Sequence, residues 1–208
     1  MTIVASDHKN YRLLVAIRYL NASEELFKGL KTQQKNNQFH FLVTVRSFIE
    51  YTRRGIWFLA WAKDKKLQQA EHLTFKEAGS PDLPTMDAML NEALGFGRIC
   101  PLMDTVPGVN EPFLHCLHAL THGNPISVRM VGIGLNKIFD TEGLLRKAEA
   151  DMNIFQILVH RSAAGEPLHE TWKALKQICS NPDDLRANVK IAAHKVKTQG
   201  GIKIEIVP

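Results

Sequence analysis

The sequence has little cysteine, and its few cysteines form no recognised pattern. Three occur among 208 residues, Cys100, Cys116 and Cys179, an odd number placed far apart. None belongs to a CxxC pair, so neither a zinc knuckle nor a disulfide framework is indicated. A chain of this length buries enough surface on folding to need no such staple. We therefore expect free thiols in a reducing compartment.

Long hydrophobic runs are also lacking. The longest, Gly55 to Ala62, is far shorter than the ~20 apolar residues of a membrane-spanning helix. Near the first residue, the polar residues Asp7, His8 and Lys9 precede any apolar stretch, which is not the pattern of a signal peptide. The sequence thus predicts a cytoplasmic protein with no membrane partner.

Common catalytic signatures are missing as well. There is no Walker A loop and no GxSxG nucleophile elbow. Gly132 and Gly134 lack the third glycine of a dinucleotide-binding loop, because Lys137 stands at that position. Because these motifs are absent, the sequence predicts no organic cofactor.

What the sequence does contain is ordinary globular composition. Hydrophobic residues make up 45% and charged residues 23% of the chain, which argues against disorder. The net charge of +5 and the isoelectric point near 9.1 allow an acidic partner without requiring one. We expect residues 1–208 to form a single domain.

Apolar residues recur at helical spacing along most of the chain, which predicts an all-α, up-and-down bundle. The first helix is expected to begin at Ser6 or Asp7 and to run to about Lys31. A polar loop over residues 32–38 and a long helix from about Phe39 to about Leu73 should follow. Further helices are expected over residues 85–94, 111–122 (capped by Asn110), 127–139, 141–164, 167–180 and 181–200.

The two ends of the chain have strand character. Residues 202–207 alternate and are rich in isoleucine and valine, as in a β-strand. One strand cannot satisfy its own backbone, so it should pair either with residues 1–5 or with another chain. We therefore predict a small terminal β appendage, and a homodimer formed through the C-terminal strand if the pairing is between chains.

Three histidines, His115, His118 and His122, follow one another at helical spacing. Imidazoles four residues apart can share a divalent metal such as zinc. The spacing of His118 and His122 is that of the HExxH zinc-protease motif, but Ala119 replaces its catalytic glutamate. One alternative is therefore a metal-binding helical-bundle hydrolase. The other is three helix histidines hydrogen-bonded to their neighbours.

A second candidate face lies on the long helix, where Arg46, Glu50, Arg53 and Trp57 recur at helical spacing. If this face is buried, its charges must be paired, since an unpaired buried charge costs several kcal/mol. The face is then either a structural network or part of an active site. The remaining alternative is a solvated stripe with Trp57 against the core.

The last predicted helix carries a basic stripe formed by Arg186, Lys190, His194 and Lys197. Apolar residues occupy its opposite side. One basic face on an amphipathic helix is typical of a surface that follows nucleic-acid phosphates, and also of an ordinary lysine-rich surface helix. The stripe is a candidate nucleic-acid-binding site.

Two segments together resemble the HEPN superfamily: residues 45–61 (VRSFIEYTRRGIWFLAW) and residues 120–125 (LTHGNP). Its members are helical bundles, several of them ribonucleases of toxin–antitoxin and phage-defence systems. They carry an Arg and a Glu on an early long helix, and a Ser/Thr–His step near a Pro at the end of a later one. The matching residues here are Arg46, Glu50, Thr121 and His122.

The resemblance implies a role for each of these groups. If the protein is catalytic, His122 would be the general acid or base, Arg46 or Arg53 would stabilise the anionic transition state, and Glu50 would hold one arginine. The sequence departs from the family in one respect, because no Arg is followed by a His after four to six residues. The expected function is accordingly the binding of RNA or a nucleotide, with cleavage not implied.

Three functions thus remain open on the sequence. The first is an HEPN-like protein that binds RNA or a nucleotide, in a toxin–antitoxin or phage-defence setting. The second is the metal-binding hydrolase, and the third is a non-enzymatic protein–protein interaction bundle. The first requires the arginine-bearing helix and the histidine-bearing helix to meet in space.

Overall fold

The structure is a computed structural model that describes residues 8–60, 83–86, 88, 105–167, 170 and 173. Nearly all of this part of the chain is helical, with one small antiparallel sheet, so the prediction of an all-α bundle with a β appendage is confirmed. The elements are α1 (His8–Asn36), α2 (Gln38–Ala60), β1 (Thr105–Val106), β2 (Glu111–Pro112), α6 (Phe113–His122), α7 (Pro125–Ile133), α8 (Leu135–Ile138) and α9 (Thr141–Ala163).

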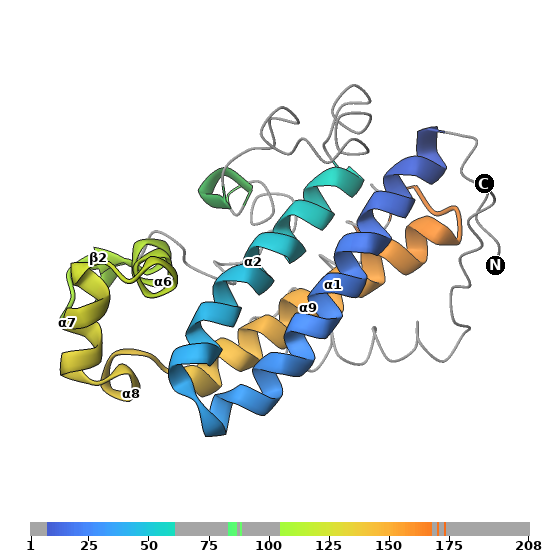
Figure 1. The fold of residues 1–208 in the computed structure, drawn as a ribbon. Coiled ribbons are helices and arrows are strands. Elements are labelled where there is room, and N and C mark those ends of the chain that lie inside the picture. The colour runs from blue at the N-terminus through green and yellow to red at the C-terminus, as the bar shows by residue number, and fades with distance from the viewer. Residues whose placement is uncertain are drawn as a thin grey trace.

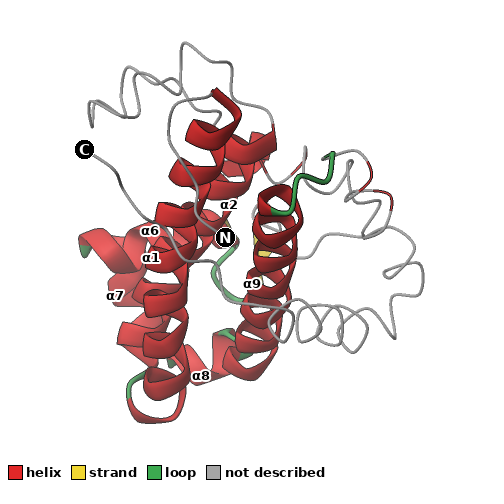
Figure 2. Cartoon of the chain, turned by 90° about the vertical axis from the view of Figure 1, so that its right-hand side faces the viewer, coloured by secondary structure: helices red, strands yellow, loops and turns green. Residues whose placement is uncertain are grey.

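Three long helices form the body of the molecule (Figure 1). α1 and α2 are an antiparallel hairpin, and α9 packs against both of them. The shorter α6 packs against α2, and α7 and α8 follow at the same end of the bundle (Figures 1 and 2). The core between the helices is aliphatic and aromatic, with Phe41, Phe48, Phe58 and Phe155 fully buried. None of the described helices is long and apolar enough to cross a membrane.

The turn between α1 and α2 is shorter than predicted. The polar segment 32–38 was expected to be a loop, yet α1 continues to Asn36 and only Asn37 interrupts the helices. The expectation is wrong because a contact between the helices, and not an apolar period, engages this turn: the Thr44 hydroxyl of α2 donates to the Gln33 side-chain carbonyl at 2.9 Å. The Thr32 hydroxyl and the Asn36 amide bond back to carbonyls one turn earlier, at 3.2 and 3.0 Å. Asn37 then caps α2 by accepting from the His40 N–H at 3.0 Å.

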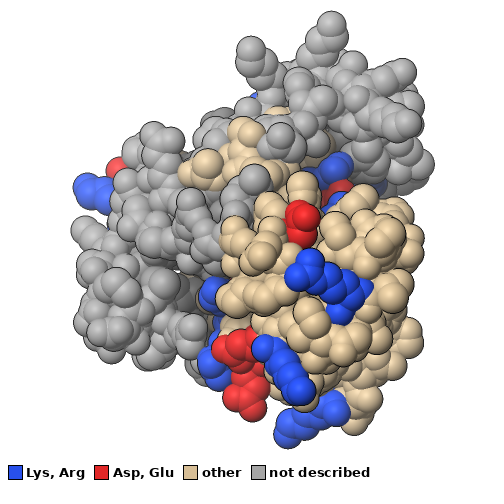
Figure 3. Space-filling model, turned by 90° about the vertical axis from the view of Figure 1, so that its left-hand side faces the viewer, with Lys and Arg blue, Asp and Glu red and all other residues tan. Residues whose placement is uncertain are grey.

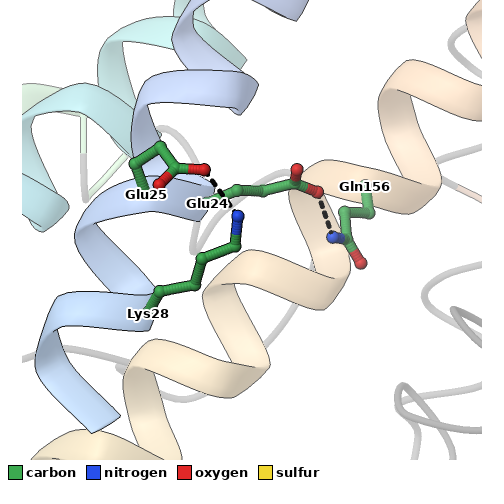
Figure 4. Close-up of polar contacts among 4 residues, drawn as sticks. All are labelled: Glu24, Glu25, Lys28 and Gln156. Carbon is green, nitrogen blue, oxygen red and sulfur yellow. Dashed lines mark hydrogen bonds and ion pairs between the residues drawn. The ribbon is translucent and has the colours of Figure 1, made fainter. Parts of the chain in front are cut away.

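The three long helices approach one another closely at Gly55 on α2. A Cβ atom at this position would lie 2.2 Å from Cζ of Phe155 on α9 and 2.7 Å from Cβ of Tyr19 on α1. The absence of a side chain at Gly55 therefore allows all three helices to meet. Polar contacts join the same helices at their edges: the Gln156 amide donates to the Glu24 carboxylate at 2.6 Å (Figure 4).

The observed sheet lies within the chain, between α2 and α6 in sequence. β1 and β2 pair with Thr105 opposite Pro112 and Val106 opposite Glu111. The sequence predicted no helix or strand between residues 94 and 111 and a helix over residues 111–122 capped by Asn110, and both expectations are corrected. Asn110 has a φ of 60°, a left-handed turn conformation, whereas an N-cap residue is extended. Its turn closes the hairpin, and α6 begins only at Phe113.

The following helices agree better with the sequence. The helix expected over residues 127–139 is divided, because Gly134 ends α7 with a φ of 101° and α8 follows. Asn124 caps α7, and its side chain accepts from the N–H groups of Ile126 and Ser127 at 3.0 and 3.3 Å. α9 matches the helix predicted over residues 141–164 almost to the residue.

Several predictions concern residues outside the described part of the chain. They are the terminal strands at residues 1–5 and 202–207, the last helix over residues 181–200, residues 61–73 of the long helix, and most of the helices expected over residues 85–94 and 167–180.

Candidate functional site

α6 exposes all three of the histidines singled out in the sequence. Its opposite side is apolar and buried, through Phe113, Cys116, Leu117, Ala119 and Leu120. α6 packs against α2, and the charge of Arg46 on α2 acts on His118 of the exposed histidine face. We call the surface formed by His115, His118 and His122 with Arg46 of α2 the Arg46–histidine face.

The rings of His118 and His122 are adjacent, and the charge of Arg46 acts on His118. The ring centroids of His118 and His122 are 4.2 Å apart. The pKa of His118 lies below its usual range, first because the ring loses hydration, and then because the charge of Arg46 and those of the two other histidines repel its protonated form. Arg46 is half-buried on α2, so two helices bring one guanidinium and two imidazoles to a shared surface.

Substituting Arg46 should raise the pKa of His118. Arg46→Met removes a positive charge that disfavours the imidazolium, so the ring should take up its proton at higher pH. An NMR titration of the His118 ring protons measures this midpoint. Arg18→Met, which removes an exposed arginine from α1, should leave the midpoint where it is. An equal midpoint in the wild type and Arg46→Met would contradict the proximity of Arg46 and His118.

Glu50 holds neither of the two arginines that the sequence nominated, Arg46 and Arg53. Its carboxylate forms an ion pair with Arg54, at 2.7 Å, and not with Arg46. Both members of this pair are about one-quarter to one-third exposed. Arg46 is thus not held by Glu50, and its charge acts on His118.

Arg53 belongs to the interior of the bundle. Its side chain is 1% exposed and forms an ion pair with Asp151 of α9, at 3.1 Å, whose side chain is 2% exposed. A guanidinium in this position cannot contact a substrate that arrives from solvent. Of the two arginines nominated to stabilise a transition state, only Arg46 is accessible. The face predicted on the long helix therefore divides into a buried structural part and a surface part.

Asp151 is the polar residue of this interior that sequence reasoning missed. The signal was its place within the apolar stripe of α9, among Ala148, Met152 and Phe155. A carboxylate in such a stripe requires a buried cation. A second buried polar contact, from the Thr52 hydroxyl to the Ser23 hydroxyl at 3.1 Å, joins α2 to α1.

The remaining residues near the face are not obvious nucleophiles. Thr121 is exposed, and its hydroxyl donates to the Leu117 carbonyl at 2.9 Å. Burial, followed by the charge of Glu111, raises the pKa of the Cys116 thiol to about 11. The thiol is therefore protonated at neutral pH and is not activated for attack.

The predicted metal site receives no geometric support. Within the described ranges no group of three or more His, Cys, Asp and Glu side chains is placed to hold a metal ion. The His115 ring lies beside the Glu111 carboxylate, with 3.6 Å between Nδ1 and Oε2. The zinc alternative stays a prediction. The basic stripe of Arg186, Lys190, His194 and Lys197 lies outside the described residues.

The neighbouring helix α7 presents apolar side chains to solvent. Val128 is 70% exposed, and Val131 and Ile133 are exposed as well. Figure 3 shows this side of the molecule, where separate charged side chains stand among uncharged ones. The protein–protein interaction alternative also stays a prediction. No protein-family model, curated protein or solved structure matches the chain, so side-chain geometry is the basis for assigning a function.

Proposed function

We propose that the protein binds RNA or a nucleotide by its phosphate groups, at the Arg46–histidine face. The observation that carries the proposal is the convergence of Arg46 from α2 with the adjacent rings of His118 and His122 from α6. Guanidinium and protonated imidazole are strong donors to phosphate oxygens. Their arrangement on an exposed surface leaves room for an extended, charged ligand.

The electrostatics favour an anion that arrives from outside. The loss of hydration and the charges of Arg46, His122 and His115 raise the cost of protonating His118. A phosphate between them reverses this cost, because an anion stabilises the charged imidazolium. Binding should therefore take up protons and become tighter as the pH falls through the range in which histidine titrates. Arg46, a permanent cation, together with the titratable His118 and His122 is suited to coupling phosphate binding to proton uptake.

The proposal is for binding and not for cleavage. The Arg-to-His motif of the HEPN ribonucleases is absent from the sequence, Arg53 is buried against Asp151, and Glu50 is paired with Arg54. The resemblance to the HEPN superfamily adds a toxin–antitoxin or phage-defence setting to the proposal. The basic stripe on residues 186–197 would supply further phosphate contacts.

Removing the charged groups of the face should weaken RNA binding. For the triple variant Arg46→Met, His118→Ala and His122→Ala, we expect at least a ~10-fold loss of affinity at pH 6, since a charge-assisted hydrogen bond contributes about 1.5–3 kcal/mol. For a single-stranded ligand, the slope of log affinity against log salt should flatten by about 0.7 for each phosphate group that the variant no longer neutralises. Fluorescence anisotropy with a labelled single-stranded RNA measures both quantities.

The control is His40→Ala combined with Arg18→Met, which removes an exposed histidine and an exposed arginine from elsewhere on the helical hairpin. This variant should keep the wild-type increase in affinity between pH 8 and pH 6, whereas the triple variant should lose it. Circular dichroism checks that both variants are folded. The proposal fails if the wild type does not bind RNA or nucleotide, or if the triple variant binds with unchanged affinity and pH dependence.

A further inference from the structure

A separate cavity lies where the β-hairpin meets the α8–α9 junction. Its volume is about 200 Å³, and it opens to solvent on one side. The buried rings of Phe113 and Phe139, edge to face with centroids 6.1 Å apart, line it together with Val106. Ile138 and Leu144 continue the apolar wall. Segments that are well separated in sequence thus enclose one apolar space.

The rim of the cavity carries one cation that no described residue neutralises. Lys147, which is half-buried on α9, lines the cavity and forms no ion pair in the described part of the chain. The other charged group at the rim, Asp140, is already engaged. One of its carboxylate oxygens accepts from the Gly143 N–H at 2.8 Å, and the other lies 3.9 Å from an Arg146 nitrogen.

We propose that this cavity binds a small monocarboxylate with a single aromatic ring. The ring would lie against Phe113 and Phe139, where its apolar surface leaves water. The carboxylate would pair with the Lys147 ammonium at the rim. The site is independent of the proposed RNA-binding surface, because the two share no residue.

Size and charge decide between this ligand and its alternatives. Drug-sized ligands occupy roughly 300–1,000 Å³, so a cavity of about 200 Å³ takes one ring and not a nucleoside. A doubly charged phosphate would also lie close to the Asp140 carboxylate at the same rim. A single negative charge is repelled less and still neutralises Lys147.

The probe for this site is phenylacetate, with phenylacetamide as its neutral counterpart and phenethylamine as its cationic one. Two-dimensional ¹H–¹⁵N NMR of the full chain should show phenylacetate shifting the resonances of Phe139, Leu144 and Lys147. Lys147→Met should lower the affinity for phenylacetate by about 10-fold, since the substitution removes one charge-assisted contact. The affinity for phenylacetamide should stay unchanged. Leu144→Trp should fill the cavity and abolish the binding of both phenylacetate and phenylacetamide.

Lys137→Met, on α8 but not among the residues that line the cavity, is the matched control and should bind phenylacetate as the wild type does. Equal binding of phenylacetate and phenylacetamide by the wild type would overturn the assignment of Lys147. If phenethylamine bound more tightly than phenylacetate, Asp140 and not Lys147 would be the charged group that pairs with the ligand. Displacement of phenylacetate by uridine monophosphate would make the cavity a nucleotide site. Lys147 is at the rim, so its variant remains informative even if Leu144→Trp does not fold.

Discussion

Replacing Arg53 by methionine should lower the free energy of unfolding by about 3–5 kcal/mol, because the substitution leaves a charged Asp151 inside the bundle without its guanidinium. Both side chains are almost completely buried, and their N–O distance is 3.1 Å. For a chain of this size the same loss lowers the melting temperature by roughly 6–20 °C. Urea unfolding followed by circular dichroism measures the free energy directly.

The charge, rather than the volume, of Arg53 can be tested with a second substitution. Arg53→Met combined with Asp151→Leu removes both charges and should recover part of the loss, since apolar replacements of a buried pair are often tolerated. Arg18→Met, an exposed arginine on α1, should change the free energy by less than about 0.5 kcal/mol. If Arg53→Met were as stable as Arg18→Met, the ion pair would have no structural role.

Arg53 also illustrates what spacing along a helix can and cannot predict. The spacing of Arg46, Glu50 and Arg53 places them on one side of α2, which was predictable from helical geometry. It does not specify what packs against each turn. Asp151 is 98 residues further along the chain, and only the packing of α9 on α2 makes it the partner of Arg53.

The same limit applies to the elements of the fold. α9 was predictable because its apolar period is long and Asp140 precedes it as a cap. The continuation of α1 through residues 32–36 was not, since these polar residues have no apolar period and Gln33 is engaged by Thr44 of α2, a contact that exists only once the hairpin has formed. The β-hairpin depends on turn conformations at Gly108 and Asn110, which a periodicity analysis does not detect.

For the candidate site, the sequence predicted the histidine spacing on α6 but not the position of Arg46 relative to it. That position results from the packing of α6 on α2, through apolar residues such as Leu117 and Leu120 that carry no functional signal. The cavity beside Lys147 was not predictable for the same reason. Its two aromatic rings come from α6 and from the segment before α9, and each alone resembles an ordinary core residue.

The close helix contact at Gly55 gives the second large effect. Gly55→Ala should lower the free energy of unfolding by about 1–3 kcal/mol through overpacking, although alanine is the better helix former by about 1 kcal/mol. The added Cβ would lie 2.2 Å from a Phe155 ring atom and 2.7 Å from Cβ of Tyr19. The ring is enclosed by the core, and Cβ of Tyr19 is fixed to the backbone of α1. Relief therefore requires the helices to separate.

Gly29→Ala is the matched control, because it makes the same substitution within α1 at a position where a Cβ would have no atom within 4 Å. Only helix propensity should act there, so this variant should be more stable than the wild type by up to about 1 kcal/mol. Urea unfolding of the two variants side by side separates packing from propensity, since the backbone change is identical. The change in the free energy of unfolding should have opposite signs in the two variants. A Gly55→Ala variant as stable as Gly29→Ala would mean that the three helices do not approach one another as closely as the structure places them.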